Sequence, residues 1–232
     1  MKNLLHETPY DKIFGSKVER MRLVSDSDIA NKTVLDIGCG FGWCAWNFIQ
    51  RGVALVTGVD VSNDAADVFR SIDNQKIKFF RASALELPFG NETFDTAVSW
   101  ETIEHVPKNT EKQMLLEIFR VLKPGGILYL STQHRSFIST ICDPAWWLIG
   151  HRHYTIKELT SLALSAGFTV NKIYTKGGIN TVLFMLNLYI AKWIFQRPPF
   201  FEQYFKNKCT KEFEKQTGYT NIFMKCTKSV SS

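Results

Sequence analysis

The residues best suited to chemistry are an acid, three closely spaced glycines and a second acid further along the chain. Asp36 ends a short apolar stretch, and Gly38, Gly40 and Gly42 follow it at alternate positions. A glycine turn between a strand and a helix presents backbone N–H groups and a positive helix end to a ligand, and glycine allows close approach. Asp60, about twenty residues after the turn, is placed to accept hydrogen bonds from ribose hydroxyls. The pattern predicts a nucleoside-containing ligand.

The spacing of the glycines distinguishes two classes of such ligand. A dinucleotide-binding turn has the pattern G-x-G-x-x-G, which would require a third glycine at position 43, where this chain has Trp43. The chain instead has D-x-G-x-G-x-G from Asp36 to Gly42. A nicotinamide-dependent oxidoreductase on a similar sheet is therefore the less favoured alternative, and NAD binding tests it.

Four segments resemble, in the same order, motifs of the class I S-adenosylmethionine (SAM) dependent methyltransferases. The first is the acid-and-glycine turn. The others are Arg81–Phe89, similar to the adenine loop, Phe94–Ser99 with Ile103–Val106, similar to the fourth strand and its loop, and Leu122–Gly126, similar to the turn before the fifth strand. The resemblance covers roughly residues 30 to 132. It looks closest to the small-molecule branch that includes ubiquinone and menaquinone biosynthesis enzymes.

The resemblance implies SAM as the cofactor and assigns a role to matching residues. Asp36 and the glycine backbone would hold the methionine part, Asp60 the ribose, and Val61 would pack on adenine. Ser83 stands where the family has an aspartate, which weakens the adenine contact, while Ala84 still offers its backbone N–H. The implied cofactor-binding residues are Asp36, Gly38, Cys39, Gly40, Gly42, Asp60, Val61, Ser83, Ala84 and Trp100.

The loop after the fourth strand faces the expected position of the transferred methyl group. Methyl transfer from a sulfonium is an in-line displacement that needs positioning, and a base is required only when the acceptor must lose a proton. His105 is the preferred base because a histidine pKa lies near neutrality, and a purely orienting role for it stays open. Glu101 is the alternative.

Three further histidines could converge on the substrate side. His134, His151 and His153 lack the paired helical spacing of a metal site, so no metal is predicted. The five cysteines also lack the paired spacing of metal ligands, and they indicate a reduced compartment.

Apolar stretches alternate with helical patterns from residue 34 onward, which predicts an α/β fold with a mostly parallel sheet and helices on both faces. The resemblance implies that this sheet is doubly wound, Rossmann-like and seven-stranded, with an antiparallel last strand. Expected strands cover residues 34–37, 54–60, 76–80, 94–99, 126–131, 168–174 and 219–228. Expected helices cover residues 42–51, 63–72 and 109–121, and a further helix starts at a capping box of Thr155 and Glu158.

Two segments lie outside this repeating pattern. Residues 1–32 are expected to cap the pocket, and residues 33–232 to form the methyltransferase domain. Residues 177–218 form an apolar helical insertion in which Lys192 is the only charge between Lys176 and Arg197. This insertion is interpreted as a helix packed on the domain, a wall of an apolar substrate pocket, or a peripheral membrane contact through residues 179–205.

Composition sets broad limits on function. The chain has 232 residues, a net charge of +6, 45% apolar residues and 22% charged residues, which is ordinary for a globular protein. The mild positive charge is accounted for by a solvated surface, and no recognition motif favours nucleic acid. The beginning of the chain lacks a secretion signal, which predicts a cytoplasmic protein with an option of membrane association.

The sequence therefore predicts a SAM-dependent methyltransferase that acts on an O or C atom, or an N atom, of a small hydrophobic or lipid-like acceptor. Two alternatives remain open: a SAM-binding regulatory or assembly subunit without turnover, and an RNA methyltransferase. The acceptor and the oligomeric state are not determined by the sequence.

Overall fold

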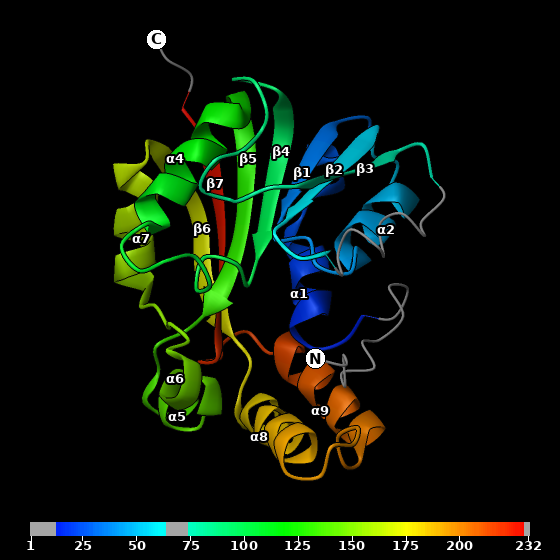
Figure 1. Ribbon diagram of the computed structural model, residues 1–232, viewed down its shortest axis with the longest axis vertical. Helices are drawn as coiled ribbons and strands as arrows, with labels where there is room; N and C mark the ends of the chain where they lie inside the picture. Colours follow the sequence, from blue (N-terminus) through cyan, green and yellow to red (C-terminus); the bar gives the residue numbers. More distant parts are fainter. Residues whose placement is uncertain (1–12, 64–73, 230–232) are drawn as a thin grey trace.

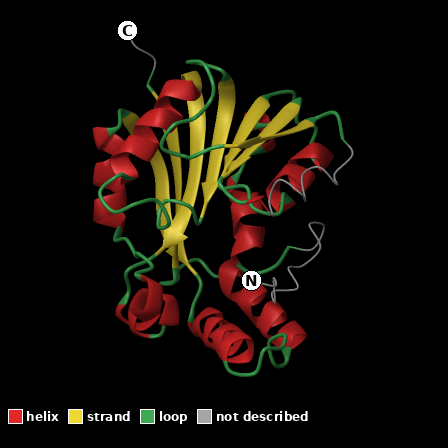
Figure 2. Ribbon diagram, viewed as in Figure 1, coloured by secondary structure: helices red, strands yellow, loops and turns green. Residues whose placement is uncertain are grey.

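The computed structural model describes residues 13–63 and 74–229, which form one seven-stranded sheet with helices on both faces (Figures 1 and 2). The strand order is β3-β2-β1-β4-β5-β7-β6. Strands β1 to β5 pair in parallel, and β7 runs antiparallel to both β5 and β6. The predicted fold class, including the antiparallel last strand, is confirmed.

The strands lie close to the predicted positions. They are β1 (Thr33–Ile37), β2 (Leu55–Asp60), β3 (Ile77–Arg81), β4 (Phe94–Trp100), β5 (Leu122–Gln133), β6 (Phe168–Lys176) and β7 (Asn221–Lys228). The largest difference is in β5, which begins four residues before the predicted start at residue 126. Leu122 pairs with Phe94 while Ile127 pairs with Thr96, so the Pro-Gly-Gly segment forms an irregularity within the strand rather than a separate turn.

Helices fill both faces of the sheet and one of its ends. They are α1 (Ser16–Leu23), α2 (Trp43–Gln50), α4 (Glu111–Val121), α5 (Phe137–Ile141), α6 (Pro144–Ile149), α7 (Ile156–Ser165), α8 (Ile179–Trp193) and α9 (Glu202–Glu214), with a 3-10 turn at Asp26–Asp28. The capping box of Thr155 and Glu158 starts α7 as predicted. The helix predicted over residues 63–72 falls almost entirely outside the described residues.

Alternating side chains of the buried strands pack against helices on opposite faces. Leu35 and Ile37 of β1 join a cluster that contains Met114 of α4 and Leu159 of α7. Val34 joins a second cluster on the other face, which contains residues of α2. Because successive side chains of a strand point to opposite faces, β1 is apolar on both and lies at the centre of the fold.

The remaining helices gather beyond the C-terminal ends of the parallel strands. Figure 1 shows α5, α6, α8 and α9 at that end of the sheet. The short helices α5 and α6 are not among the elements predicted from the sequence pattern. Helix α1 belongs to the predicted N-terminal segment, of which residues 1–12 lie outside the described residues. Gly15, just before α1, donates its N–H to Thr210 of α9.

The predicted helical insertion consists of two helices, α8 and α9. A buried acid of α9 links them through hydrogen bonds. Glu212 of α9 accepts hydrogen bonds from the backbone N–H groups of Gly178, Asn180 and Thr181 at 2.8–3.1 Å. These groups form the first turn of α8, whose N–H groups have no partner within the helix. Burial alone raises the pKa of Glu212, but these N–H groups outweigh it and lower the pKa.

In the part of the chain that the structure describes, none of the helices combines the length and the apolar character needed to cross a bilayer.

Candidate active site

The turn after β1 is tied to the end of β2. The backbone N–H groups of Gly38 and Cys39 both donate to the carbonyl of Val59, at 2.8 and 3.1 Å. Gly38 has a φ of +69°, and a Cβ atom there would lie 2.2 Å from Oγ1 of Thr102. Glycine is required at this position because a side chain would both strain the backbone and collide with the loop after β4.

Asp60 ends β2 and holds the glycine turn through its carboxylate. Oδ2 accepts the N–H of Gly40 at 3.0 Å, and Oδ1 accepts the N–H of Ser62 at 2.9 Å. Each carboxylate oxygen keeps a further lone pair for another donor. Among the described residues, no atom lies within 4 Å of where a Cβ atom at Gly40 would be, so this part of the turn is not packed against them. Both features suit the ribose predicted to bind here.

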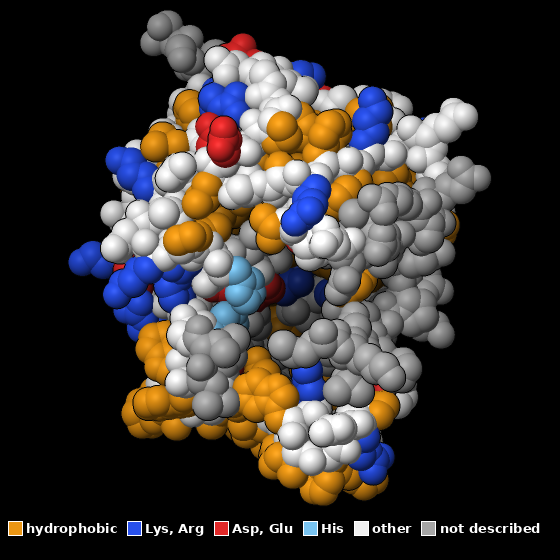
Figure 3. All heavy atoms as spheres, viewed as in Figure 1, with side chains coloured by type: hydrophobic (Ala, Val, Ile, Leu, Met, Phe, Trp, Pro, Cys, Tyr) orange, Lys and Arg blue, Asp and Glu red, His pale blue; other side chains and the backbone are white. Residues whose placement is uncertain are grey.

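A cavity of about 440 Å³ opens beside these groups at the C-terminal edge of the sheet. Seven of the predicted site residues line it: Gly38, Asp60, Val61, Ser83, Ala84, Glu101 and His105. Figure 3 shows a hollow in the surface beside the pale blue histidine side chains, with acidic and basic side chains inside it. The topology thus brings together residues predicted to bind cofactor and residues predicted to act on the acceptor.

Three other predicted cofactor residues are buried behind this cavity. Trp100 belongs to the core cluster around α2, and its indole N–H donates to Sγ of Cys44 at 3.3 Å. Cys39 lies in the same cluster. Asp36 is only 1% exposed, and none of the three is among the residues that line the cavity. The structure therefore places them as supports of the turn.

Asp36 is an electrostatically unfavourable group near the cavity. Its Oδ2 atom is buried and has no hydrogen-bond partner. Burial, and to a lesser extent the charge of Asp60, raise the pKa of Asp36 from 3.8 to about 7. A buried carboxylate without a partner is stabilised by a cationic ligand group. The ammonium and sulfonium groups of SAM are of this kind, so the buried carboxylate of Asp36 fits the cofactor.

The loop predicted to contact adenine is attached to α4. The backbone N–H of Leu87 donates to Oε2 of Glu117, and the guanidinium of Arg120 donates to the carbonyls of Leu87 and Phe89. Arg120 also pairs with Glu117 at 2.8 Å. The sequence analysis missed these residues, because the helical periodicity of α4 does not show which loop its polar side chains reach. They fix the segment that presents Ser83 to the cavity.

Glu101 is held as an anion by several donors. Arg20 of α1 contacts its Oε1 atom at 2.9 Å, and Ser131 and Gln133 of β5 donate to its oxygens at 2.8 Å. Burial opposes the charge, but Arg20 and the donor groups outweigh it, so the pKa of Glu101 is lowered. A carboxylate stabilised in this way is a poor proton acceptor. Its contacts suit it to position neighbouring groups.

Glu104 has the opposite electrostatic character. It is 4% exposed, its Oε2 accepts from Thr132 at 2.9 Å, and its Oε1 has no partner. Burial and the negative charge of Glu101 raise the pKa of Glu104 well above its ordinary value. The two neighbouring acids are thus driven to different protonation states.

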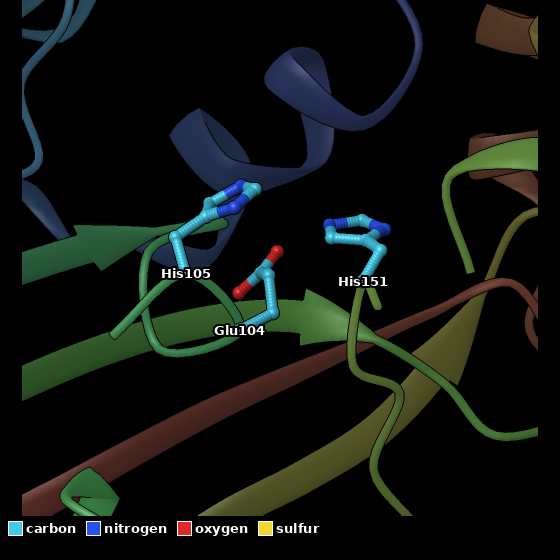
Figure 4. Close-up of side chains that lie close together, drawn as sticks. All are labelled: Glu104, His105 and His151. Carbon is cyan, nitrogen blue, oxygen red and sulfur yellow. The ribbon is translucent and has the colours of Figure 1, made fainter. Parts of the chain in front are cut away.

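His105 lies at the rim of the cavity and stacks on His151. Their ring centroids are 5.0 Å apart, and Figure 4 shows both rings beside the carboxyl group of Glu104. Loss of hydration, and then the proximity of His151, lower the pKa of His105 below 6.5. At neutral pH the imidazole is therefore uncharged and has a nitrogen lone pair that can accept a proton.

The same residues form a set of donor atoms. Glu104, His105 and His151 each offer one ligand atom, and these atoms lie within 4.8 Å of one another. Asp143, His151 and His153 form a second such set in the described residues. Imidazole nitrogens with a carboxylate are the ligand types of zinc and iron. His134, predicted to join them, instead contacts the carbonyl of Tyr219.

Arg152 is a further residue that the sequence analysis missed. Its guanidinium donates to the carbonyls of Ile103 and Val106, on either side of Glu104 and His105. The hydroxyl of Tyr154 donates to the same Ile103 carbonyl at 3.2 Å. These contacts connect residues about fifty positions apart, so neither spacing nor periodicity shows them. They hold the loop in the position that brings His105 to the cavity.

Fold and site together define a doubly wound α/β domain with a cavity at the C-terminal edge of its parallel strands. Residues 34–126 match the model of a family described as "Methyltransferase domain". The chain is 36% identical over 116 residues to a ubiquinone biosynthesis O-methyltransferase of Pseudomonas fluorescens, a match that covers 47% of each chain. This part of the chain is similar to SAM-dependent methyltransferases, whose cofactor is SAM.

Solved structures extend the likeness over the whole fold. A SAM-dependent methyltransferase from Mesorhizobium loti superimposes with a TM-score of 0.64 at 15% identity, covering 94% of this chain and all of that one. A Burkholderia thailandensis 1,6-didemethyltoxoflavin-N1-methyltransferase, solved with bound S-adenosylhomocysteine, gives a TM-score of 0.56 at 20% identity, covering 86% and 72%. These likenesses concern the fold. The chain spans 38–59% of the length of the first curated relatives that it matches.

The unusual pKa of Asp36 leads to a prediction about pH. The proton is bound more tightly in the folded state, so the stability it contributes is complete below about pH 4 and is lost as the pH rises through about 7. We expect Asp36→Asn to match the wild type at low pH and to exceed its unfolding free energy by up to about 4 kcal/mol at pH 8. Urea unfolding at several pH values measures this difference.

The same substitution should weaken SAM binding at pH 8, because it removes a buried negative charge from the turn predicted to hold the cationic cofactor. A variant with the same pH dependence of stability as the wild type would show that Asp36 is ionised normally in the folded protein.

Proposed function

We propose that this protein transfers a methyl group from SAM to an oxygen or carbon atom, or a nitrogen atom, of a small hydrophobic or lipid-like acceptor. The observation that supports this proposal most is the shared cavity, in which His105 lies across from the predicted ribose and adenine contacts Asp60 and Ser83. We further propose that the reaction takes place in the cytoplasm or at a membrane surface facing it.

SAM supplies an activated methyl group on a sulfonium, so the protein's main task is to position two reactants and exclude water. Asp60 binds the ribose, and Val61 and Ala84 border the adenine. The buried carboxylate of Asp36 stabilises the cationic end of SAM. For a hydroxyl or phenol acceptor, a ring nitrogen of His105 accepts the proton that the acceptor oxygen loses as the new carbon–oxygen bond forms. Glu101 keeps its charge and orients Arg20 and Gln133 beside the cavity.

The choice of a hydrophobic acceptor is supported by the apolar end of the molecule. Figure 3 shows apolar side chains gathered over α5, α6 and α8. The most exposed apolar side chains at this end are Phe137, Trp147, Ile194, Phe195, Phe201 and Tyr204, at 56–81% exposure. The ubiquinone-biosynthesis relative is named as an O-methyltransferase, which is consistent with an apolar acceptor whose reacting atom is an oxygen.

A transfer assay tests the proposed activity. We expect the protein to move label from methyl-tritiated SAM into a total lipid extract, and His105→Gln to reduce the rate about 100-fold or more without abolishing SAM binding. Because the pKa of His105 is lowered, the rate should rise with pH below about 6.5 and level off above it. His134→Gln is the matched control, because that ring contacts Tyr219.

The other functions give different results in the same assay. Label that enters RNA would indicate an RNA methyltransferase, whose binding would weaken with salt. SAM binding without transfer to any lipid, metabolite or RNA fraction would indicate a regulatory or assembly subunit. Equal rates for His105→Gln and the wild type would show that no base acts at this position.

A separate experiment tests the proposed membrane contact through residues 179–205. Lys192 and Arg197 lie beside the exposed apolar residues Ile194, Phe195 and Phe201, a combination that favours anionic lipid surfaces. We expect the protein to sediment with phosphatidylglycerol vesicles, and a variant with serine at all three apolar positions to remain in solution. Leu164→Ser, which changes an exposed leucine of α7, is the control. Unchanged sedimentation of the triple variant would contradict the proposal.

A further inference from the structure

A second cavity, of about 300 Å³, lies between α1, α8 and α9 and the end of the sheet. One part of its wall is apolar and comes from α8, through Val182, Phe184, Met185 and Leu188. These side chains belong to the insertion that the sequence pattern separates from the rest of the domain. The cavity is distinct from the one that holds the predicted cofactor contacts.

The other part of the wall is polar and centres on one ion pair. Arg20, Gln133 and Asn221 line the cavity, and each donates to the carboxylate of Glu101. Glu101 itself lines the cofactor cavity. The ion pair between Arg20 and Glu101, at 2.9 Å, therefore forms part of the boundary between the two cavities.

Arg20 has a donor that the protein does not use. The side chain is buried, with 6% exposure, and one terminal nitrogen binds Glu101. Its Nε atom is also buried but has no hydrogen-bond partner. A buried donor without a partner is unfavourable, and the same side chain lines the second cavity. The guanidinium would bind an anionic oxygen more strongly than a neutral one.

From these observations we infer that the second cavity binds the methyl acceptor as an amphiphile, with its apolar part along α8 and an anionic or strongly accepting oxygen at the guanidinium of Arg20. The inference rests on the proposed methyl transfer and adds the substrate class. An acceptor held this way has its polar end at the boundary with the cofactor cavity. Its apolar end lies among the helices α8 and α9, which carry the exposed apolar surface.

Decanoate is a suitable probe because it joins a carboxylate to a flexible apolar chain, and 1-decanol supplies the same chain with a neutral head. Calorimetric titration should show saturable decanoate binding to the wild-type protein. Met185→Trp, which fills the apolar part of the cavity, should weaken binding of both probes at least 10-fold. Arg20→Gln should weaken decanoate at least 10-fold and 1-decanol less than 3-fold. Arg22→Gln, on the same helix with a half-exposed side chain, should leave both unchanged.

SAM titration of each variant separates this inference from the proposed function. Met185→Trp should bind SAM as the wild type does, which also shows that it is folded. Decanoate binding that is absent from the wild type, or unaffected by Met185→Trp, would overturn the assignment of the cavity. Equal losses for the two probes in Arg20→Gln would overturn the role of Arg20. Failure of the wild type to bind SAM would instead overturn the proposed function.

Discussion

The hydrogen bond between the Asp60 carboxylate and the N–H of Gly40 connects the two segments on which the cofactor cavity depends. It joins the end of β2 to the turn after β1, and the bonds from Gly38 and Cys39 to the carbonyl of Val59 reinforce the same connection. The turn must adopt positive φ angles at all three glycines to reach this position. The Asp60 carboxylate orders the turn and is also the group predicted to bind the ribose. One side chain therefore stabilises the turn and forms the predicted ligand contact.

Buried charge is the second organising feature, and three acids near the site experience it differently. Glu101 is compensated by Arg20 and keeps its charge, whereas Asp36 and Glu104 each have an oxygen without a partner and a raised pKa. Uncompensated buried groups reduce stability, and their concentration around two cavities is typical of a binding site. Arg20, a cation, likewise has a buried atom, Nε, without a hydrogen-bond partner.

The sequence predicted the elements that are specified by local residue patterns. Apolar strands and the glycine turn are local patterns, so the strands lie near the expected positions and the sheet has the expected topology. Seven predicted site residues meet in one cavity because the C-terminal ends of parallel strands share an edge. The buried positions of Asp36, Cys39 and Trp100 depend instead on which face each side chain takes, which the motif does not specify.

Contacts between distant segments could not be predicted. His151 reaches His105 only because α5 and α6, two short helices without a clear periodic pattern, bring the chain back over the sheet end. Arg152, Arg120 and Glu212 act on loops or helices from 30 to 50 residues away. Their roles follow from tertiary structure, and a single sequence contains no periodic signal for them.

The most direct test of the central claim is calorimetric titration of the protein with SAM, with NAD as the control ligand. We expect saturable SAM binding, no NAD binding, and a loss of SAM affinity in Asp60→Asn. Asp26→Asn, which changes an exposed acid, should bind SAM normally. Absence of SAM binding by the wild type, or equal affinity in Asp60→Asn, would contradict the assignment of the cavity as the cofactor site.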